Sequence, residues 1–334
     1  MVEAIVVHGG AGTWRNTPSV ESALSAIKHC TELGWGILRG GGSSLDAVVE
    51  AVKCMEDSGY FNAGYGSALN LLGERELDAG LMTSAGIVGA VAAVKFTKNP
   101  VLLARLVAEK TPHVILAGEN ADRFALIHGL PPLPPPPKHV VDKYRELLKR
   151  VFEGRKVNGY YAALREFVDK SAAYSRLVRE LLELHGTVGA AAVDRGGVLA
   201  AATSTGGLAL KLPGRVGDTP VPGAGFYATS RIACSATGIG EKVLRVMPCL
   251  RLDLEYSSVG GDLERALRRV VEYIECTVGT NTLGFVGVDA TGRVFYAYNT
   301  EAMIIGYTRN GSVKVSLRPE PKAAVIDVAE HTQR

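Results

Sequence analysis

Residues 185–207 read HGTVGAAAVDRGGVLAAATSTGG, and this stretch decides the predicted fold. Within it, Val188–Ala202 holds two runs of small and β-branched residues around the polar turn Asp194-Arg195-Gly196-Gly197. A polar turn between two such runs is typical of a β-hairpin. The runs are apolar nearly throughout rather than alternating, so we expect both faces of the sheet to be covered.

Two further segments show the same pattern and extend this prediction. Gly86–Leu103 has the turn Thr97–Pro100, and Leu283–Tyr298 has the turn Asp289–Gly292. Apolar spacing and capping residues predict helices elsewhere, over Ser19–Arg39, Ser44–Met55, Glu119–His128, Gly240–Leu250 and Gly261–Cys276. Together these elements predict an α+β fold, a four-layer α/β/β/α sandwich in which helices cover two stacked, mainly antiparallel sheets.

The composition is that of a globular chain with an ample core, since 47% of the 334 residues are hydrophobic and 21% are charged. We expect a single domain over 1–334. The net charge of +3 is too small to indicate nucleic-acid or membrane partners. Met1–Val7 does not resemble a signal peptide, and no uncharged stretch approaches the roughly 20 apolar residues of a membrane span. We therefore expect a cytoplasmic protein.

Five scattered cysteines never form a C-x-x-C pair, which argues against a zinc site or a secreted disulfide framework. They are Cys30, Cys54, Cys234, Cys249 and Cys276. Free cysteine is commonly buried, so we expect buried free thiols.

The segment 131–184 differs in composition from the rest of the chain. Prolines at 131, 132 and 134–137 predict a stiff, solvated spacer, with a ligand for a polyproline-binding domain as the weaker alternative. Lys138–Leu184 is charged and has helical apolar spacing, for example at Tyr144, Leu147 and Leu148. We interpret 131–184 as a linker that is first proline-rich and then helical.

Thr187 is the candidate nucleophile. A threonine hydroxyl needs a neighbouring base, and the α-amine of the same residue supplies one if the chain is cut between Gly186 and Thr187. A free α-amine has a pKa of roughly 7.7–8.0, so a useful fraction is unprotonated at neutral pH. The alternative is an ordinary β-branched residue that opens a strand.

Other residues suit the same chemistry, each with a structural alternative. A hydroxyl at Thr203–Thr205 could bond the nucleophile or belong to a solvated turn. Arg215 and Asp218 suit the α-carboxylate and α-ammonium of an amino acid, or form a surface ion pair. Thr237–Glu241 opens a predicted helix, where backbone N–H groups could stabilise an oxyanion or glycines could merely form the turn.

Two N-terminal motifs are less specific. The stretch VVHGGAG at 6–12 is read as a strand followed by glycines, like the phosphate-binding loop of a kinase, but it matches neither G-x-G-x-x-G nor the Walker A spacing. Asn62, in FNAG after a predicted helix, could orient a catalytic group or close a turn.

Together these motifs resemble the plant-type asparaginase / isoaspartyl peptidase family of N-terminal-nucleophile hydrolases. The resemblance covers roughly 4–130 and 185–310, and rests on HGGAG, FNAGYGSALN, PVLLARLVAEKTPH, HGTVGAAAV, AATSTGG, KLPGRVGD and GAGFYA…ATGIGE in that order. Any one of these motifs is weak, but the ordered set is highly specific. The linker departs from the family pattern, in which this segment is usually flexible.

The resemblance implies a role for each candidate residue. Self-cleavage between Gly186 and Thr187 would give an α subunit, 1–186, and a β subunit, 187–334. Thr187 would be nucleophile and base, supported by the hydroxyls of Thr205 and Thr237. The remaining roles are an oxyanion hole at Thr237 and Gly238, substrate binding by Arg215, Asp218, Gly238 and Gly240, and support of the nucleophile by Asn62.

The resemblance also implies the reaction and the partners. The substrate would be L-asparagine or an isoaspartyl (β-aspartyl) dipeptide, converted to L-aspartate through a β-aspartyl ester of Thr187. No cofactor would take part in the chemistry, and the mature form would be a homodimer of α/β pairs. A structural Na⁺ would be held by backbone oxygens of a loop, at Met55, Glu56, Ser58, Phe61, Ala63 and Tyr65.

Three alternatives remain at this stage. A glycosylasparaginase shares the fold and the nucleophile, but typically has Asp before the threonine and a secretory signal, whereas this chain has Gly186. An uncleaved, inactive binding scaffold and a kinase are the other two.

Overall fold

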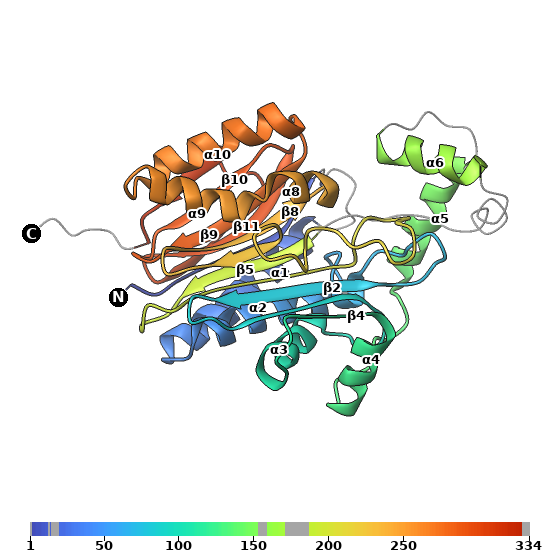
Figure 1. The fold of residues 1–334 in the computed structure, drawn as a ribbon, viewed down its shortest axis with the longest axis horizontal. Coiled ribbons are helices and arrows are strands. Elements are labelled where there is room, and N and C mark those ends of the chain that lie inside the picture. Colours follow the sequence, from blue (N-terminus) through green and yellow to red (C-terminus); the bar gives the residue numbers. More distant parts are fainter. Residues whose placement is uncertain (1, 13, 15–19, 153–158, 171–186, 329–334) are drawn as a thin grey trace, which may run out of the picture.

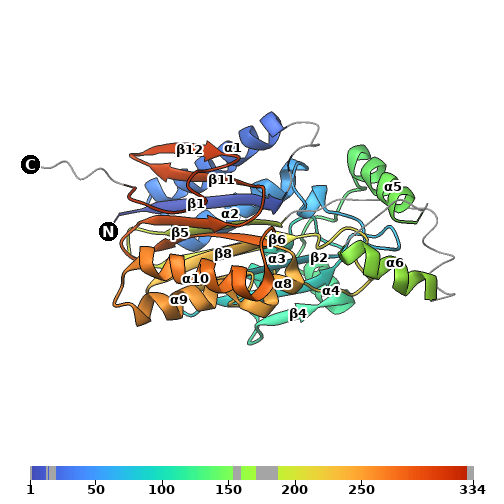
Figure 2. The same ribbon diagram turned by 90° about the horizontal axis from the view of Figure 1, so that it is seen from above.

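The computed structural model describes residues 2–12, 14, 20–152, 159–170 and 187–328. Two β-sheets are stacked face to face, and helices cover the outer face of each (Figure 1). Seen from above, the helices that cover the second sheet lie in front of the strands (Figure 2). The predicted four-layer α/β/β/α sandwich is therefore confirmed.

The first sheet has eight strands among the described residues, in the order β12-β11-β1-β5-β6-β2-β3-β4. All neighbours are antiparallel except β3 and β4. The strands are β1 (Ala4–Gly12), β2 (Leu77–Thr83), β3 (Val88–Val94), β4 (Ile115–Ala117), β5 (Thr187–Val193), β6 (Leu199–Thr205), β11 (Ala302–Arg309) and β12 (Ser312–Ser316).

The second sheet has the order β13-β10-β9-β8-β7 and is antiparallel throughout. Its strands are β7 (Phe226–Ala228), β8 (Ile232–Gly238), β9 (Leu283–Asp289), β10 (Val294–Tyr298) and β13 (Ala323–Ile326). Apolar side chains from both sheets, such as Ala191, Ala201 and Val288, are fully buried in the layer between them.

Helices α1 (Val20–Arg39), α2 (Ser44–Ser58), α3 (Pro100–Lys110) and α4 (Gly118–Ile127) pack on the first sheet. Helices α8 (Gly240–Val246), α9 (Pro248–Ser258) and α10 (Leu263–Val278) pack on the second. Helix α2 shows how the sequence sets a boundary. The Ser43 side chain accepts a hydrogen bond from Asp46 N at its start, and Gly59 ends it with φ 73°.

The hairpins predicted at Val188–Ala202 and Leu283–Tyr298 are confirmed, but the one at Gly86–Leu103 was wrong. The turn of that hairpin lies earlier, between β2 and β3, and Pro100 begins α3. Proline favours the first position of a helix because its missing N–H has no partner there.

The single helix predicted at Gly240–Leu250 was also wrong, because α8 and α9 are separate. The chain breaks at Met247, which has φ 47° directly before Pro248. A residue that precedes proline avoids the helical conformation, and this steric rule explains the break.

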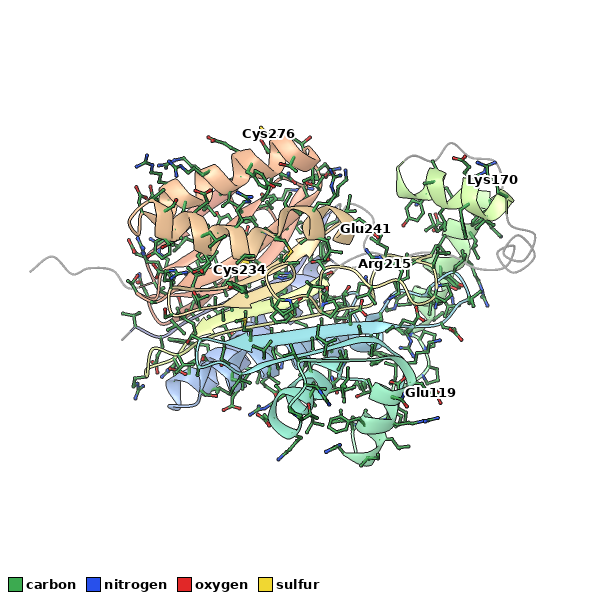
Figure 3. The ribbon with its side chains drawn as sticks, viewed as in Figure 1. Glu119, Lys170, Arg215, Cys234, Glu241 and Cys276 are labelled. Carbon is green, nitrogen blue, oxygen red and sulfur yellow. A yellow bond between two sulfur atoms is a disulfide. The ribbon has the colours of Figure 1, made fainter. Side chains whose placement is uncertain are left out.

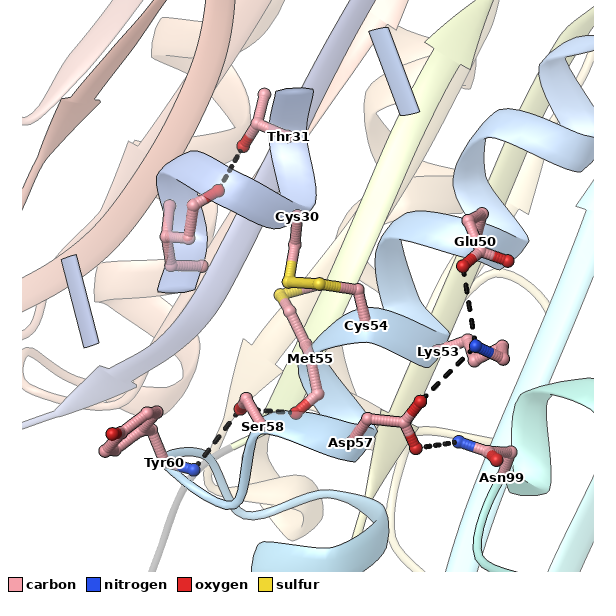
Figure 4. The surroundings of a disulfide bond; sticks show 11 residues. Cys30, Thr31, Glu50, Lys53, Cys54, Met55, Asp57, Ser58, Tyr60 and Asn99 are labelled. Atoms are coloured by element: carbon pink, nitrogen blue, oxygen red, sulfur yellow. Dashed lines mark hydrogen bonds and ion pairs between the residues drawn. A yellow bond between two sulfur atoms is a disulfide. The ribbon is translucent and has the colours of Figure 1, made fainter. Parts of the chain in front are cut away.

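The prediction of buried free thiols was wrong for all five cysteines. Disulfides join Cys30 to Cys54 and Cys234 to Cys249, and Cys276 is free but exposed on α10 (Figure 3). The first disulfide links the packed helices α1 and α2 (Figure 4). Each pair has a Cα–Cα distance of 5.5 Å, within the range a disulfide needs, and this proximity comes from tertiary packing rather than sequence spacing.

The proline-rich stretch is solvent-exposed in part, as predicted, but it is also fastened to the body. Lys98 N donates to Pro131 O (3.0 Å), Leu133 N donates to Phe96 O (2.6 Å), and an Arg75 guanidinium N–H donates to Pro134 O. These contacts tie the stretch to the segment after β3 and to Arg75, just before β2.

The predicted helical pattern of the linker is confirmed for α5 (Lys138–Phe152) and α6 (Tyr160–Lys170), while 171–186 lies outside the described residues. One side of α5, which includes Tyr144, Leu147 and Leu148, is buried in a cluster that also contains Leu71 and Leu210. No helix in the described part of the chain is long and apolar enough to span a membrane.

Candidate active site

Thr187 and Thr205 meet at one end of the layer between the sheets. Thr187 begins β5, Thr205 ends β6, and the two residues are direct partners in the antiparallel register. Side chains of direct partners lie on the same face of a sheet. The Thr187 hydroxyl donates a hydrogen bond of 3.1 Å to Thr205 Oγ1, and both side chains are buried. Gly186, on the other side of the predicted cut, lies outside the described residues.

Asn62 holds the end of β6 in place. Its Nδ2 donates to Gly207 O (2.7 Å), its Oδ1 accepts from Ala68 N (2.6 Å), and its backbone carbonyl accepts from Gly206 N (3.0 Å). Gly207 N in turn donates to Thr205 Oγ1 (3.0 Å). Asn62 therefore contacts the turn that orients Thr205, and makes no hydrogen bond to Thr187 among the described groups.

Thr237 and Gly238 end strand β8 of the second sheet, which packs on β5 across the layer. Thr237 Oγ1 accepts a hydrogen bond from Ala11 N (3.2 Å), which leaves the hydroxyl proton available to another acceptor. Gly238 has φ 148°, and a Cβ there would lie 2.5 Å from Thr282 O. Only glycine fits this position.

His8 links the two sheets beside these hydroxyls, a role that sequence reasoning did not assign. Its Nε2 lies 2.9 Å from Ser235 Oγ, in full burial. Burial lowers the pKa of His8 to about 3, although a contact with the Thr187 backbone acts in the opposite direction. The ring is therefore neutral at physiological pH and serves as a hydrogen-bonding group.

Arg215 forms a two-pronged ion pair with Glu241, the second residue of α8. Arg215 Nε and Nη2 donate to the two carboxylate oxygens at 2.9 and 2.8 Å, and the two residues lie side by side in Figure 3. Burial opposes the charge of Arg215, but Glu241, Asp218 and Asp78 together outweigh it and raise the pKa of the guanidinium. Nη1 makes no hydrogen bond to a described residue and lies near Gly207.

Asp218 and Gly240 complete the predicted binding group. A Cβ on Gly240 would lie 2.6 Å from Arg215 Nη2 and 3.0 Å from Asp218 Oδ1, so both side chains border this glycine. Asp218 Oδ2 is buried and accepts no hydrogen bond from a described group. Burial raises the pKa of Asp218 to about 7, against the opposing effects of its own backbone N–H and Arg215. The structure thus brings a cation and an anion together.

Sequence reasoning missed three buried charged residues nearby, Glu76, Asp78 and Lys211. Asp78 on β2 is the direct register partner of Thr205, so Asp78, Thr205 and Thr187 form a row across three strands. Charged residues inside the apolar runs ELDAGLM and LALKL were the available signal, because a charge is rarely fully buried without a partner.

The predicted sodium loop follows α2 and includes the 3-10 turn η1 (Gly64–Gly66). The predicted carbonyls at Met55, Ala63 and Tyr65 already accept hydrogen bonds, from Ser58 Oγ (2.8 Å, Figure 4), Gly66 N (3.2 Å) and Arg75 Nη1 (3.1 Å). A carbonyl oxygen has two lone pairs, so one hydrogen bond does not prevent coordination.

The carbonyls of Glu56 and Phe61 lie so close to Gly64 and Gly66 that no Cβ fits between them. Backbone carbonyl oxygens are the donor type that a hard cation prefers. The Glu56 side chain points elsewhere, since its carboxylate accepts from Val101 N and Asn99 Nδ2. No cluster of three or more acidic, histidine or cysteine side chains within the described ranges is arranged to hold a metal.

Comparisons with known proteins agree with the resemblance seen in the sequence. A family model described as asparaginase matches residues 1–317. The chain is 43% identical to a plant-type L-asparaginase of Pyrobaculum calidifontis over 94% of its own length and 99% of that protein. It is 39% identical to a plant-type L-asparaginase of Pyrococcus horikoshii, over 96% and 99%. It is also 39% identical to an isoaspartyl peptidase of Escherichia coli, over 90% of both chains. The prediction of an amidohydrolase is confirmed, and the chain belongs to the asparaginase family.

Proposed function

We propose that this chain is a self-processing amidohydrolase that converts L-asparagine, isoaspartyl dipeptides or both to L-aspartate. The observation that carries the proposal is the hydrogen bond between Thr187 and Thr205 at the first residue of β5. It orients a buried hydroxyl at the place where a chain cut would create a new N-terminus. The relatives' names support the same class of substrate.

In the processing step, Thr187 Oγ1 attacks the carbonyl carbon of Gly186, and the acyl group moves from the Thr187 nitrogen to its oxygen. Water then hydrolyses the ester. The products are an α subunit, 1–186, and a β subunit, 187–334, whose first residue carries a free α-amine. The strand β5, buried over all seven residues, holds that terminus in place.

In the hydrolytic step, the α-amine of Thr187 takes the hydroxyl proton, and Oγ1 attacks the side-chain amide carbonyl of the substrate. The Thr237 hydroxyl and the Gly238 N–H donate to the developing oxyanion. Ammonia leaves with the transferred proton and a β-aspartyl ester remains on Thr187. Water then attacks this ester and releases aspartate, which restores the hydroxyl.

Arg215 and Asp218 would bind the part that asparagine and isoaspartyl dipeptides share. Arg215 Nη1, which Glu241 does not use, faces the α-carboxylate, and the buried carboxylate of Asp218 accepts from the α-ammonium. Because neither residue contacts the group that leaves, the same site serves both substrate classes.

We further propose that the loop of Met55, Glu56, Ser58, Phe61, Ala63 and Tyr65 holds a structural Na⁺ through its backbone oxygens, which a Na⁺-dependent rise in Tm would support. We also propose that the mature protein is a homodimer of α/β pairs, to be measured by sedimentation, and that it is cytoplasmic, to be measured by cell fractionation. Disulfides are uncommon in a reducing cytosol, so the fractionated protein should be tested for Cys30–Cys54.

The decisive variant is Thr187→Ala, compared with Thr187→Ser and with Thr308→Ala as the matched control. Thr308 is a buried threonine of β11 that bonds the Ile5 backbone, away from the site. We expect wild type and Thr308→Ala to yield fragments 1–186 and 187–334 by mass spectrometry, and Thr187→Ser to do so more slowly. Thr187→Ala should stay intact and lose at least about 10⁴-fold in asparagine turnover. Full turnover by intact Thr187→Ala would refute the proposal.

A further inference from the structure

The loop between β6 and β7 is hydrogen-bonded to Asn62, Leu69 and Leu71, and at two further points to Glu76, directly before β2. The backbone carbonyl of Glu76 accepts a hydrogen bond of 2.9 Å from Lys211 Nζ. Its carboxylate accepts from Gly214 N, at 3.1 Å to Oε1 and 3.0 Å to Oε2. Glu76 thus holds the loop at two points, and the second point immediately precedes Arg215.

Lys211 is an unusual anchor because its side chain is fully buried. Burial lowers the pKa of its ammonium group, and the carboxylates of Asp78 and Glu76 act against that effect. A buried charge is costly, and an apolar side chain of similar volume often stabilises a fold equally well. A purely structural loop would not need this lysine, and the surroundings of its Nζ indicate a further role.

The Lys211 ammonium and the Arg215 guanidinium flank the same glycine. A Cβ on Gly207 would lie 2.9 Å from Lys211 Nζ and 3.3 Å from Arg215 Nη1. Gly207 N donates to Thr205 Oγ1, and Thr205 bonds Thr187. The lysine therefore lies next to the face of Arg215 that is proposed to bind substrate, on the side away from Glu241.

The two sides of the Arg215 guanidinium have different charged neighbours. Glu241, which is half exposed, occupies Nε and Nη2 on the outer side. On the inner side lie Lys211 and Asp78, both fully buried. Asp78 Oδ1 accepts from Ala93 N (2.8 Å), which fixes that carboxylate to β3. Arg215 is thus held by its backbone anchor at Gly214 and attracted by Glu241 on the outer side and Asp78 on the inner side, while the like charge of Lys211 borders Nη1.

We propose that Lys211 and Glu76 are positioning residues for Arg215: they hold the Leu208–Arg215 loop so that Nη1 meets the substrate's α-carboxylate. Neither residue touches substrate. The inference rests on the proposed function, because it assigns the carboxylate to Arg215. It predicts that loss of either anchor weakens recognition of the carboxylate specifically, with little effect on the hydroxyl chemistry or on processing.

The test compares Lys211→Met with Lys95→Met in the processed enzyme. Methionine keeps the apolar stem of the lysine and removes the ammonium. Lys95 is the matched control, since it also approaches Glu76 (3.7 Å to Oε1) but is 45% exposed and lies outside the buried group. Each variant is assayed with L-asparagine, with 3-aminopropanamide, which lacks the α-carboxylate, and with succinamate, which lacks the α-ammonium.

For Lys211→Met we expect KM for asparagine to rise about tenfold while kcat changes less than about threefold. The preference for asparagine over 3-aminopropanamide in kcat/KM should fall about tenfold, while the preference over succinamate stays within about threefold. Lys95→Met should match wild type in all three assays. Arg215→Ala serves as the reference variant, because it removes the group that is proposed to bind the α-carboxylate.

A structural defect alone would lower activity toward all three amides equally, so unchanged preferences in folded, processed Lys211→Met would overturn the inference. If Lys211→Met fails to fold, Glu76→Ala decides, because it removes the Gly214 anchor and keeps the carbonyl that Lys211 uses. Glu76→Gln retains one acceptor and should recover most of the preference. A wild type inactive on both asparagine and isoaspartyl dipeptides would instead overturn the proposed function, and this inference with it.

Discussion

The layer between the two sheets has an apolar end and a polar end, built by the same strands. On β6, Leu199 and Ala201 face the layer at one end, whereas Thr203 and Thr205 occupy the equivalent inward positions at the other. On β8, the inward residue at the apolar end is Ala233, and the inward residues at the polar end are Ser235 and Thr237. A change at the last two inward positions of each strand is thus enough to turn a packed core into a candidate site.

The two ends differ in what they demand of their neighbours. The apolar end requires only complementary packing, whereas each buried polar group left without a partner at the polar end costs free energy. His8 and Ser235 meet across the layer, and Gly189 leaves the space in which they do so. We therefore expect the polar end to be far less tolerant of an added methyl group.

The largest expected effect is at the polar end, for Gly189→Ala. Its Cβ would clash with Ser235 Oγ and lie 2.6 Å from His8 Nε2, so the bond between the sheets must break. We expect the free energy of unfolding to fall by about 2–3 kcal/mol. Chemical denaturation in a Thr187→Ala background measures it on one intact chain.

Gly36→Ala in α1 is the matched control for this substitution, because its Cβ would meet nothing within 4 Å. We expect it to be neutral or to stabilise the helix by up to about 1 kcal/mol. Equal stability of the two alanine variants would show that the His8–Ser235 contact does not constrain the layer.

A smaller effect is expected at the apolar end, for Val193→Ala. Val193 lies on β5, on the same face as Thr187 and fully buried. Loss of two methyl groups and the cavity left behind should cost about 2 kcal/mol of unfolding free energy. Because no polar group is disturbed, kcat and KM for asparagine should remain those of wild type. A change in KM comparable to that of a polar-end variant would erase the distinction between the two ends.

The comparison also explains which parts of the fold could be predicted from sequence. The β5–β6 hairpin was predictable because its runs and its turn are local signals, and α2 because its cap and apolar stripe are adjacent in the chain. The Cys30–Cys54 disulfide was not, since it depends on how α1 packs on α2. The docking of 131–152 was missed for the same reason: its partners, such as Leu71 and Leu210, are distant in sequence.

Some residues of the candidate site could likewise be predicted from the sequence, and others could not. Thr187, Arg215 and Asp218 were nominated by the chemistry that their residue types allow, and the structure brings Thr187 to Thr205 and Arg215 to Asp218. Glu241 was overlooked as the partner of Arg215 because a loop and a strand hairpin separate them in sequence. Lys211 was quoted within KLPGRVGD but given no role, because sequence alone does not reveal that it is fully buried.

The smallest expected effect is a pH dependence at the polar end, through Asp218. Burial raises its pKa to about 7, and only the ionised carboxylate binds the α-ammonium. As pH falls through 7, kcat/KM for asparagine relative to succinamate should fall about tenfold per unit. Succinamate lacks the ammonium, so the ratio cancels protonation of the Thr187 amine.

Protein stability should change in the opposite direction over the same range. The folded state favours the protonated form of Asp218, so this group's contribution to stability increases as pH falls from about 7 toward the unfolded value of 3.8. Loss of activity would therefore occur without unfolding. A preference for asparagine that is flat from pH 5 to 8 would mean that Asp218 stays ionised, and that Arg215 outweighs burial at this end of the layer.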